Sequence, residues 1–158
     1  MRNFLLDCDE ISSAPILDLL SALSCDLRAD FYPFFPKFFN IIKDIITKDQ
    51  QDADVLNYAF NCLSHLVYFL HRYLSKDIDS FLKLFLPLLT HKKGFIRSFS
   101  AGCMAFVLRK IPALRLLMLL WQINQENEAV SYKTSGNLLA EILRSPDGCF
   151  HSSSTEVC

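Results

Sequence analysis

The chain has 158 residues, of which 51% are hydrophobic and 13% aromatic, with a formal net charge of −1. This length suits one domain with a sizeable core, and only 4 glycines and 6 prolines argue against a turn-rich all-β fold. The near-zero charge excludes a global field that would draw the chain to nucleic acid or to an anionic membrane.

The first predicted element is an amphipathic helix with Pro15 near its first helical position, ending around Arg28. A second helix follows, with Asp30 as its cap and a broad apolar stripe that is typical of a core-facing helix. The stripe consists of Phe34, Phe35, Phe38, Phe39, Ile42, Ile45 and Ile46.

Asp52 or Asp54 caps the longest predicted helix, which runs to about Tyr73. The next helix, about 78–90, is apolar nearly all round, which is typical of a helix packed on several sides.

The longest apolar run in the chain, Leu116–Trp121, falls well short of the ~20 residues that a membrane span requires.

A basic turn, His91-Lys92-Lys93-Gly94, leads through Ile96-Arg97 into a helix that ends near Lys110. Pro112 stops this helix, because proline cannot continue it. We expect a further helix over 113–123 and a polar connection over 124–133. The order of helix, tight polar turn, Ile-Arg and helix is typical of HEAT-type hairpins.

Two such hairpins overlay on one another in the sequence. Val55 falls on Ile96, and in the preceding helices Phe34 falls on Phe81. The sequence separation of the two residues in each pair lies in the range of roughly 40 to 47 residues that HEAT and armadillo units show. The predicted fold class is therefore all-α, an α-solenoid of HEAT/armadillo-like helical hairpins. The prediction is one helical-repeat segment over 1–158, with hairpins at about 13–47, 52–90 and 94–126, a short helix at 137–144, and a disordered or truncated tail at 145–158.

No catalytic pattern stands out among the residues that carry chemistry. The six cysteines include no C-x-x-C pair, so we expect buried, reduced thiols of an intracellular protein. His65 and His71 are spaced so that they face different sides of one helix, which precludes joint binding of a metal. We therefore predict no enzymatic activity, no metal, no cofactor and no small-molecule substrate.

The basic cluster His91, Lys92, Lys93 and Arg97 is the candidate interaction surface. It could contact phosphate or an acidic partner from one edge of the solenoid. A local role is the alternative: Arg97 would pair with an acidic or carbonyl group of the neighbouring repeat, and the lysines would follow a helix C-terminus, where positive charge is favourable.

Several short blocks of the chain resemble one protein family, in the same order along the sequence. They are Asp30-Phe31-Tyr32-Pro33, His91-Lys92-Lys93 with Ile96-Arg97-Ser98-Phe99, and Arg109-Lys110-Ile111. That family is the large HEAT-repeat scaffold of the small-subunit processome, also called the down-regulated-in-metastasis family. The resemblance runs from about Ile16 to Ile111, in the N-terminal region of the family's proteins. Since the chain is far shorter than those proteins, we expect a fragment, a partial gene model or an alternative product.

The resemblance implies a non-catalytic α-solenoid in the nucleus and nucleolus that supports pre-rRNA processing and small ribosomal subunit biogenesis. Its implied partners are protein components of the pre-ribosomal particle, with pre-rRNA or small nucleolar RNA as further candidates in a longer parent, and no membrane. The alternative is a generic HEAT-repeat adaptor of the nuclear-transport or phosphatase-scaffold type. Expressed alone, the chain should associate through open hairpin faces, one of them around Leu116–Ile123.

Overall fold

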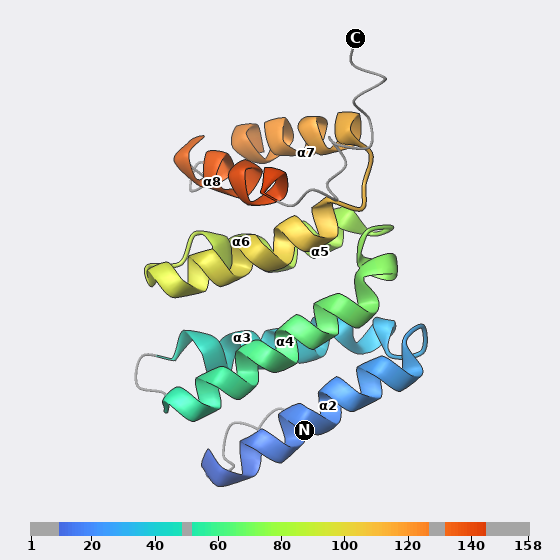
Figure 1. Ribbon diagram of the computed structural model, residues 1–158, viewed down its shortest axis with the longest axis vertical. Helices are drawn as coiled ribbons and strands as arrows, with labels where there is room; N and C mark the ends of the chain where they lie inside the picture. Colours follow the sequence, from blue (N-terminus) through green and yellow to red (C-terminus); the bar gives the residue numbers. More distant parts are fainter. Residues whose placement is uncertain (1–9, 49–51, 127–131, 145–158) are drawn as a thin grey trace. The chain divides into compact units, whose positions relative to one another are not determined.

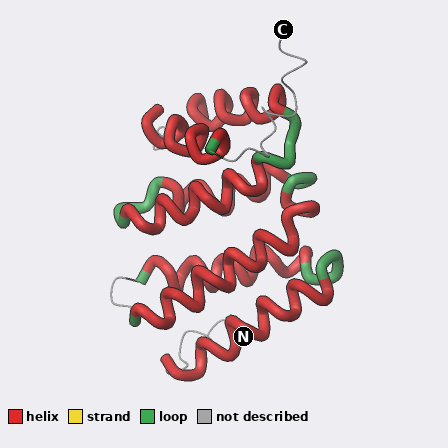
Figure 2. The backbone as a smooth tube through the Cα atoms, viewed as in Figure 1, coloured by secondary structure: helices red, strands yellow, loops and turns green. Residues whose placement is uncertain are grey.

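The computed structural model describes residues 10–48, 52–126 and 132–144 (Figure 1). Seven α-helices and one short 3-10 helix make up these ranges, and no strand occurs in them (Figure 2). The predicted all-α fold class is therefore confirmed. Within the same ranges, no helix combines the length and the apolar character needed to cross a membrane.

The helices form two compact units, Met1–Lys76 and Asp77–Cys158. In the first unit, α4 lies along α2 and also contacts α3 (Figure 1). Its elements are α2 (Glu10–Leu27), η1 (Tyr32–Phe34), α3 (Phe35–Thr47) and α4 (Ala53–Leu74).

The aromatic stripe of α3 supplies much of the first unit's core, as predicted. Phe35, Phe39 and Ile42 are almost completely buried, and burial of each such side chain contributes about 1.5–3 kcal/mol relative to exposure. Phe34 is the exception: it belongs to η1 and is 55% exposed. The turn before α3 is held by stacking of Phe31 on Phe38, with ring centroids 5.4 Å apart.

The helix starts in the first unit differ from two predictions. α2 begins at Glu10, so Pro15 lies inside the helix instead of at its first position. Asp30 does not cap α3, whose N-cap is Phe34 without a side-chain hydrogen bond. Pro33, with its fixed φ, sets up a 3-10 turn that leads into α3 instead. The predicted cap of α4 is confirmed, because the Asp54 N–H donates to the Asp52 carboxylate over 2.8 Å.

In the second unit, α6 contacts both α5 and α8, and α7 contacts α8. Figure 1 shows α7 and α8 side by side. The elements are α5 (Ile78–Leu89), α6 (Gly94–Leu108), α7 (Ala113–Glu126) and α8 (Tyr132–Leu143).

The predicted helix at 137–144 begins five residues too late. α8 starts at Tyr132, so part of the expected polar connection 124–133 is helical. Ser135 is buried there, which shows packing overriding the weak helix propensity of serine and glycine. The predicted tail 145–158 lies outside the described residues.

The pairing of helices is shifted by one helix from the predicted hairpins. The contacts join α3 to α4 and α5 to α6, in agreement with the overlay of the two hairpins in the sequence. The predicted hairpin 52–90 instead groups α4 with α5, and the boundary between the compact units falls inside it. That the chain is one continuous repeat segment stays a prediction.

Candidate functional site

The basic turn between α5 and α6 brings the four predicted site residues together, and Arg97 folds back onto it. One Arg97 guanidinium nitrogen, Nη1, donates to the carbonyl oxygens of His91 and Lys92, each over 2.7 Å. These carbonyls lie in the turn beyond the end of α5. Arg97 thus closes its own turn instead of reaching the neighbouring repeat, and its contact with a partner stays a prediction.

His91 takes part in the same turn. The Lys93 backbone N–H donates to His91 Nδ1 over 3.2 Å, so this ring nitrogen carries a lone pair and any ring proton sits on Nε2. Just before it, the Thr90 hydroxyl donates to the Leu86 carbonyl over 3.1 Å. Hydrogen bonds within the turn therefore help to order it.

Lys92 is exposed and Lys93 is half-buried. Lys93 is the N-cap of α6, where it makes no side-chain capping bond, and a cation at a helix N-terminus opposes the helix dipole. The favourable position of these lysines after the C-terminus of α5 is therefore offset by the unfavourable position of Lys93 at the N-terminus of α6. A role of these lysines in contacting phosphate or an acidic partner stays a prediction.

A polar groove of about 350 Å³ adjoins the turn within the second unit. Arg97 and Gly94 belong to both the turn and the groove, so the groove extends the candidate surface from α6 to α8. Its lining residues are Leu89, Gly94, Arg97, Ser98, Ala101, Thr134, Asn137, Ala140, Glu141 and Arg144.

An ion pair lies on the α8 side of this groove. Arg144 Nη1 is 2.7 Å from Glu141 Oε1, and the two side chains are 73% and 32% exposed. Pairs at this helical spacing in solvent contribute about 0.2–0.5 kcal/mol. The pair therefore shapes the groove more than it stabilises the fold.

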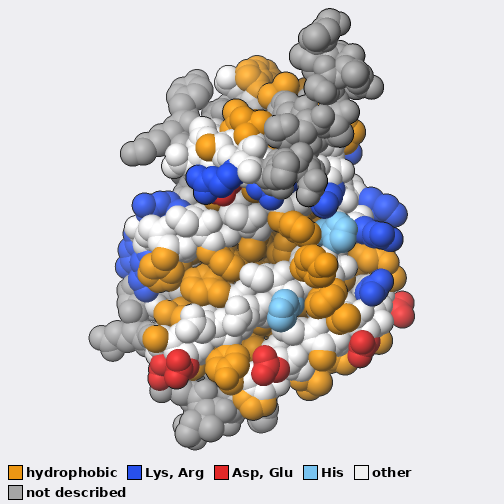
Figure 3. Space-filling model, in the orientation of Figure 1, with side chains coloured by type: hydrophobic (Ala, Val, Ile, Leu, Met, Phe, Trp, Pro, Cys, Tyr) orange, Lys and Arg blue, Asp and Glu red, His pale blue; other side chains and the backbone are white. Residues whose placement is uncertain are grey.

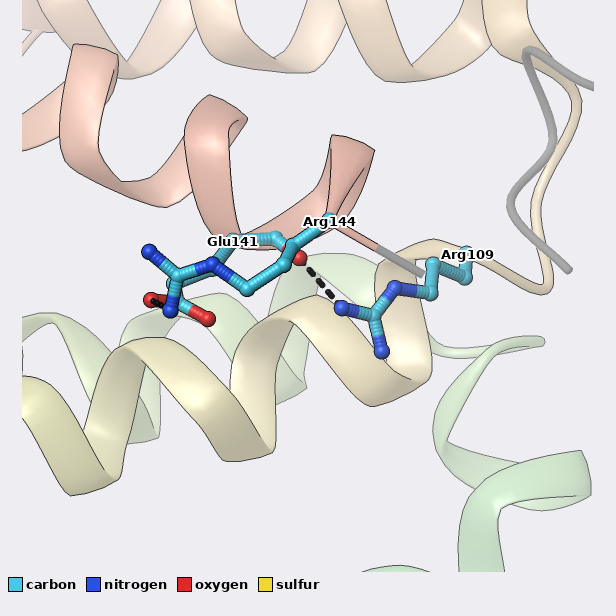
Figure 4. A network of polar contacts seen from close by, with 3 residues as sticks. All are labelled: Arg109, Glu141 and Arg144. Carbon is cyan, nitrogen blue, oxygen red and sulfur yellow. Dashed lines mark hydrogen bonds and ion pairs between the residues drawn. The ribbon is translucent and has the colours of Figure 1, made fainter. Parts of the chain in front are cut away.

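Arg109 is the residue that ties α6 to α8 (Figure 4). It lies at the C-cap of α6, where its Nε donates to the Ile142 carbonyl over 3.0 Å and its Nη2 donates to the Glu141 carbonyl. Both carbonyls are in the last turn of α8, which leaves its carbonyls without helical donors. A half-buried cation at this position also interacts favourably with the negative end of the α8 dipole.

The sequence interpretation missed Arg109 and the α8 side of the groove. One signal was available: between Asp79 and Glu126 the chain has no Asp or Glu but several cations. They are Lys83, Lys92, Lys93, Arg97, Arg109, Lys110 and Arg115. On the face shown in Figure 3, most Lys and Arg side chains lie over the second unit, and Asp and Glu side chains gather over α2 and α4 of the first.

The groups that could carry covalent or metal chemistry are dispersed. Across 10–48, 52–126 and 132–144, no three His, Cys, Asp or Glu side chains come together to hold a metal ion. Burial raises the pKa of the Cys62 thiol to about 11, against a smaller lowering by a hydrogen bond with Ser21 and a small rise from the charge of Asp18. Cys62 is therefore a protonated core thiol at neutral pH.

These features define an all-α protein of packed helix pairs with a cationic second unit. No protein-family model matches the chain. Over 110 residues the chain is 32% identical to U3 small nucleolar RNA-associated protein 20 of Saccharomyces cerevisiae, and the matched stretch covers 68% of this chain. The match covers 4% of the yeast protein, so the chain corresponds to a small part of that relative's length.

Proposed function

We propose that the chain is a segment of a non-catalytic helical-repeat scaffold that supports pre-rRNA processing and small ribosomal subunit biogenesis in the nucleolus. The observation that carries this proposal is the 32% identity over 110 residues to a U3 small nucleolar RNA-associated protein. It agrees with the resemblance, carried by the His91–Phe99 block, to the scaffold of the small-subunit processome.

The fold supports a scaffolding role. The pairs α3–α4 and α5–α6 are antiparallel helices joined by short loops, which is the building unit of HEAT-type solenoids. Helix pairs of this kind offer long surfaces to other macromolecules without a catalytic centre. On this proposal the chain contributes surface and rigidity to a larger assembly.

Its proposed partners are protein components of the pre-ribosomal particle, with pre-rRNA or small nucleolar RNA as further candidates. The run of cations without carboxylates in the second unit favours contact with phosphate. Lys92, Lys110 and Arg115 in this run are exposed, whereas Arg97 and Arg109 hold backbone carbonyls.

Co-sedimentation tests the proposal. A tagged copy of the chain, expressed in its own cells, should sediment with the particles that contain U3 small nucleolar RNA. Depletion of its transcript should lead to accumulation of uncleaved small-subunit rRNA precursor, measured by northern blot. A chain that stays at the top of the gradient, with normal precursor cleavage after depletion, would point instead to an adaptor outside ribosome biogenesis.

Variants with reversed charges test whether the cationic surface of the second unit takes part in this co-sedimentation. Lys92→Glu with Lys110→Glu should reduce the fraction that co-sediments, because both lysines belong to the cationic run. Lys37→Glu with Lys76→Glu is the matched control, since these lysines are also exposed but lie in the first unit. Equal loss in both pairs would show that the second unit has no special part in the association.

A further inference from the structure

α7 presents an apolar stripe to solvent. The exposed fractions of Leu114, Leu117, Met118 and Trp121 are 70%, 47%, 63% and 66%. Their spacing of three and four residues puts these four side chains on one face of the helix. The opposite face packs inside the unit through Leu116, Leu119, Leu120 and Ile123. A contiguous apolar face of this kind marks an interaction surface.

The border of this stripe is cationic. Arg115 is exposed on α7 beside the stripe, and exposed Lys110 precedes the helix. Lys83 of α5 lines a groove of about 500 Å³ together with Leu119 and Gln122 of α7. The stripe is therefore suited to an apolar helix whose flank is acidic.

α2 of the same chain has that chemistry. Leu19, Leu23 and Leu27 are 57%, 36% and 46% exposed, and their spacing of four residues aligns them along the helix. Asp26 is exposed three residues after Leu23, on the same side of the helix as these leucines. The α2 stripe is thus apolar with an acidic border, complementary to the α7 stripe in both hydrophobicity and charge sign.

We propose that the α2 stripe of one copy of this chain docks on the α7 stripe of a second copy, so that copies associate head to tail. Contact of α7 with α7 would bring together two borders that carry Arg115 and Lys110, and contact of α2 with α2 would bring together two borders that carry Asp26. Either symmetric pairing places like charges together, which disfavours it. This inference is independent of the proposed function in ribosome biogenesis.

A head-to-tail contact leaves one unoccupied stripe at each end of every assembly. Association then continues beyond the dimer, unless the geometry closes a ring. Sedimentation velocity of the chain of 158 residues, over a concentration series and with a reducing agent to prevent disulfides, should show growth of the mean mass with concentration. A wild-type chain that stays monomeric throughout would overturn the proposal, and α7 would then serve a different partner.

Two blocked variants test which faces meet. Met118→Glu with Trp121→Glu blocks α7, and Leu19→Glu with Leu23→Glu blocks α2. Each variant alone should be monomeric, with association weakened roughly 30-fold or more, as for loss of a central apolar anchor. An equimolar mixture should form a dimer and nothing larger, because one α2 stripe and one α7 stripe remain available.

Dimers of either blocked variant alone, or no complex in the mixture, would overturn the head-to-tail arrangement. The substituted side chains are exposed, and unchanged helical circular dichroism of each variant confirms its folding before mixing. A milder pair checks the charge argument: Arg115→Glu should weaken association, and adding Asp26→Lys to the same chain should restore it. Failure of this rescue, with the first mixture also negative, would remove both supports of the proposal.

Discussion

Arg97 and Arg109 use their guanidinium groups within the fold, Arg97 on carbonyls of the turn after α5 and Arg109 on carbonyls in the last turn of α8. Arginine suits this task, because its planar group offers several donors in a fixed geometry. Two cations of the second unit are thereby committed to structure. Lys83, Lys92, Lys110 and Arg115 are exposed and contribute positive charge to the surface of this unit.

Replacement of Arg109 should destabilise the packing of α8 on α6. Arg109→Ala removes two donors from the Ile142 and Glu141 carbonyls, and we expect the free energy of unfolding to fall by about 1–3 kcal/mol. Arg144→Ala is the control, because its exposed ion pair should contribute less than about 0.5 kcal/mol. Urea unfolding followed by circular dichroism measures both, and equal losses would contradict the assigned role of Arg109.

Arg97 offers a similar test at the basic turn. Arg97→Ala should cost about 1 kcal/mol, since both of its hydrogen bonds are exposed to solvent. Lys92→Ala, in the same turn, should change stability by less than about 0.5 kcal/mol. A larger loss for Lys92 than for Arg97, in thermal unfolding of both variants, would reverse the assignment.

Because the pKa of the Cys62 thiol is shifted, the free energy of unfolding should depend on pH, with a sign that follows from the direction of the shift. Its pKa is raised from 9.0 to about 11 by burial, so between these values the native state retains a proton that the unfolded state has lost. The contribution of Cys62 to stability is complete below pH 9 and declines as pH rises towards 11, by up to about 2–3 kcal/mol. Cys62→Ala should flatten the decline relative to wild type in urea unfolding. Parallel pH profiles would contradict it.

At the scale of elements, the existence of the helices followed from the sequence, but the start of α8 and the contacts of Arg109 with α8 did not. The 3.6-residue periodicity of Phe35–Ile46 and the Asp52 cap are local signals, and both are present in the structure. The start of α8 depends on packing of Ser135 into the second unit, which no local pattern encodes. The Arg109 contacts span more than thirty residues of sequence, so spacing rules could not identify them either.

The end of α2 depends on an uncommon backbone angle. Arg28 has a φ of 41°, in the left-handed region where a side chain costs about 1 kcal/mol and glycine is at ease. The turn that follows needs this angle, because the Phe31 and Tyr32 N–H groups both donate to the Arg28 carbonyl.

Arg28→Gly should therefore raise the free energy of unfolding by about 0.5–1 kcal/mol. The substitution also removes the exposed bond from Arg28 Nε to the Cys25 carbonyl, which contributes little in solvent. Arg28→Val is the matched control and should destabilise the fold, because a β-branched side chain tolerates this angle least. Thermal unfolding of the three chains decides, and a glycine variant less stable than wild type would contradict the prediction.

At the scale of the whole molecule, the division into two compact units bears on how the chain unfolds. Leu63 of α4 and Ile142 of α8 are both fully buried, one in each unit. Repeat proteins transmit destabilisation mainly between neighbouring elements, so a core defect should be felt first by the unit that contains it. Truncation of a buried Leu or Ile to Ala costs about 2–5 kcal/mol, enough to expose such a boundary.

We therefore expect Leu63→Ala to accelerate amide hydrogen exchange in α2, α3 and α4 while exchange in α6 and α8 stays within a few-fold of wild type. Ile142→Ala should give the reverse pattern, with α6 and α8 affected and α2 protected. Native-state exchange read by mass spectrometry resolves these helices, because local opening and global unfolding differ in the amides they expose. Equal acceleration of all helices in both variants would show that the 158 residues unfold as one cooperative body, and the boundary after Lys76 would then have no energetic meaning.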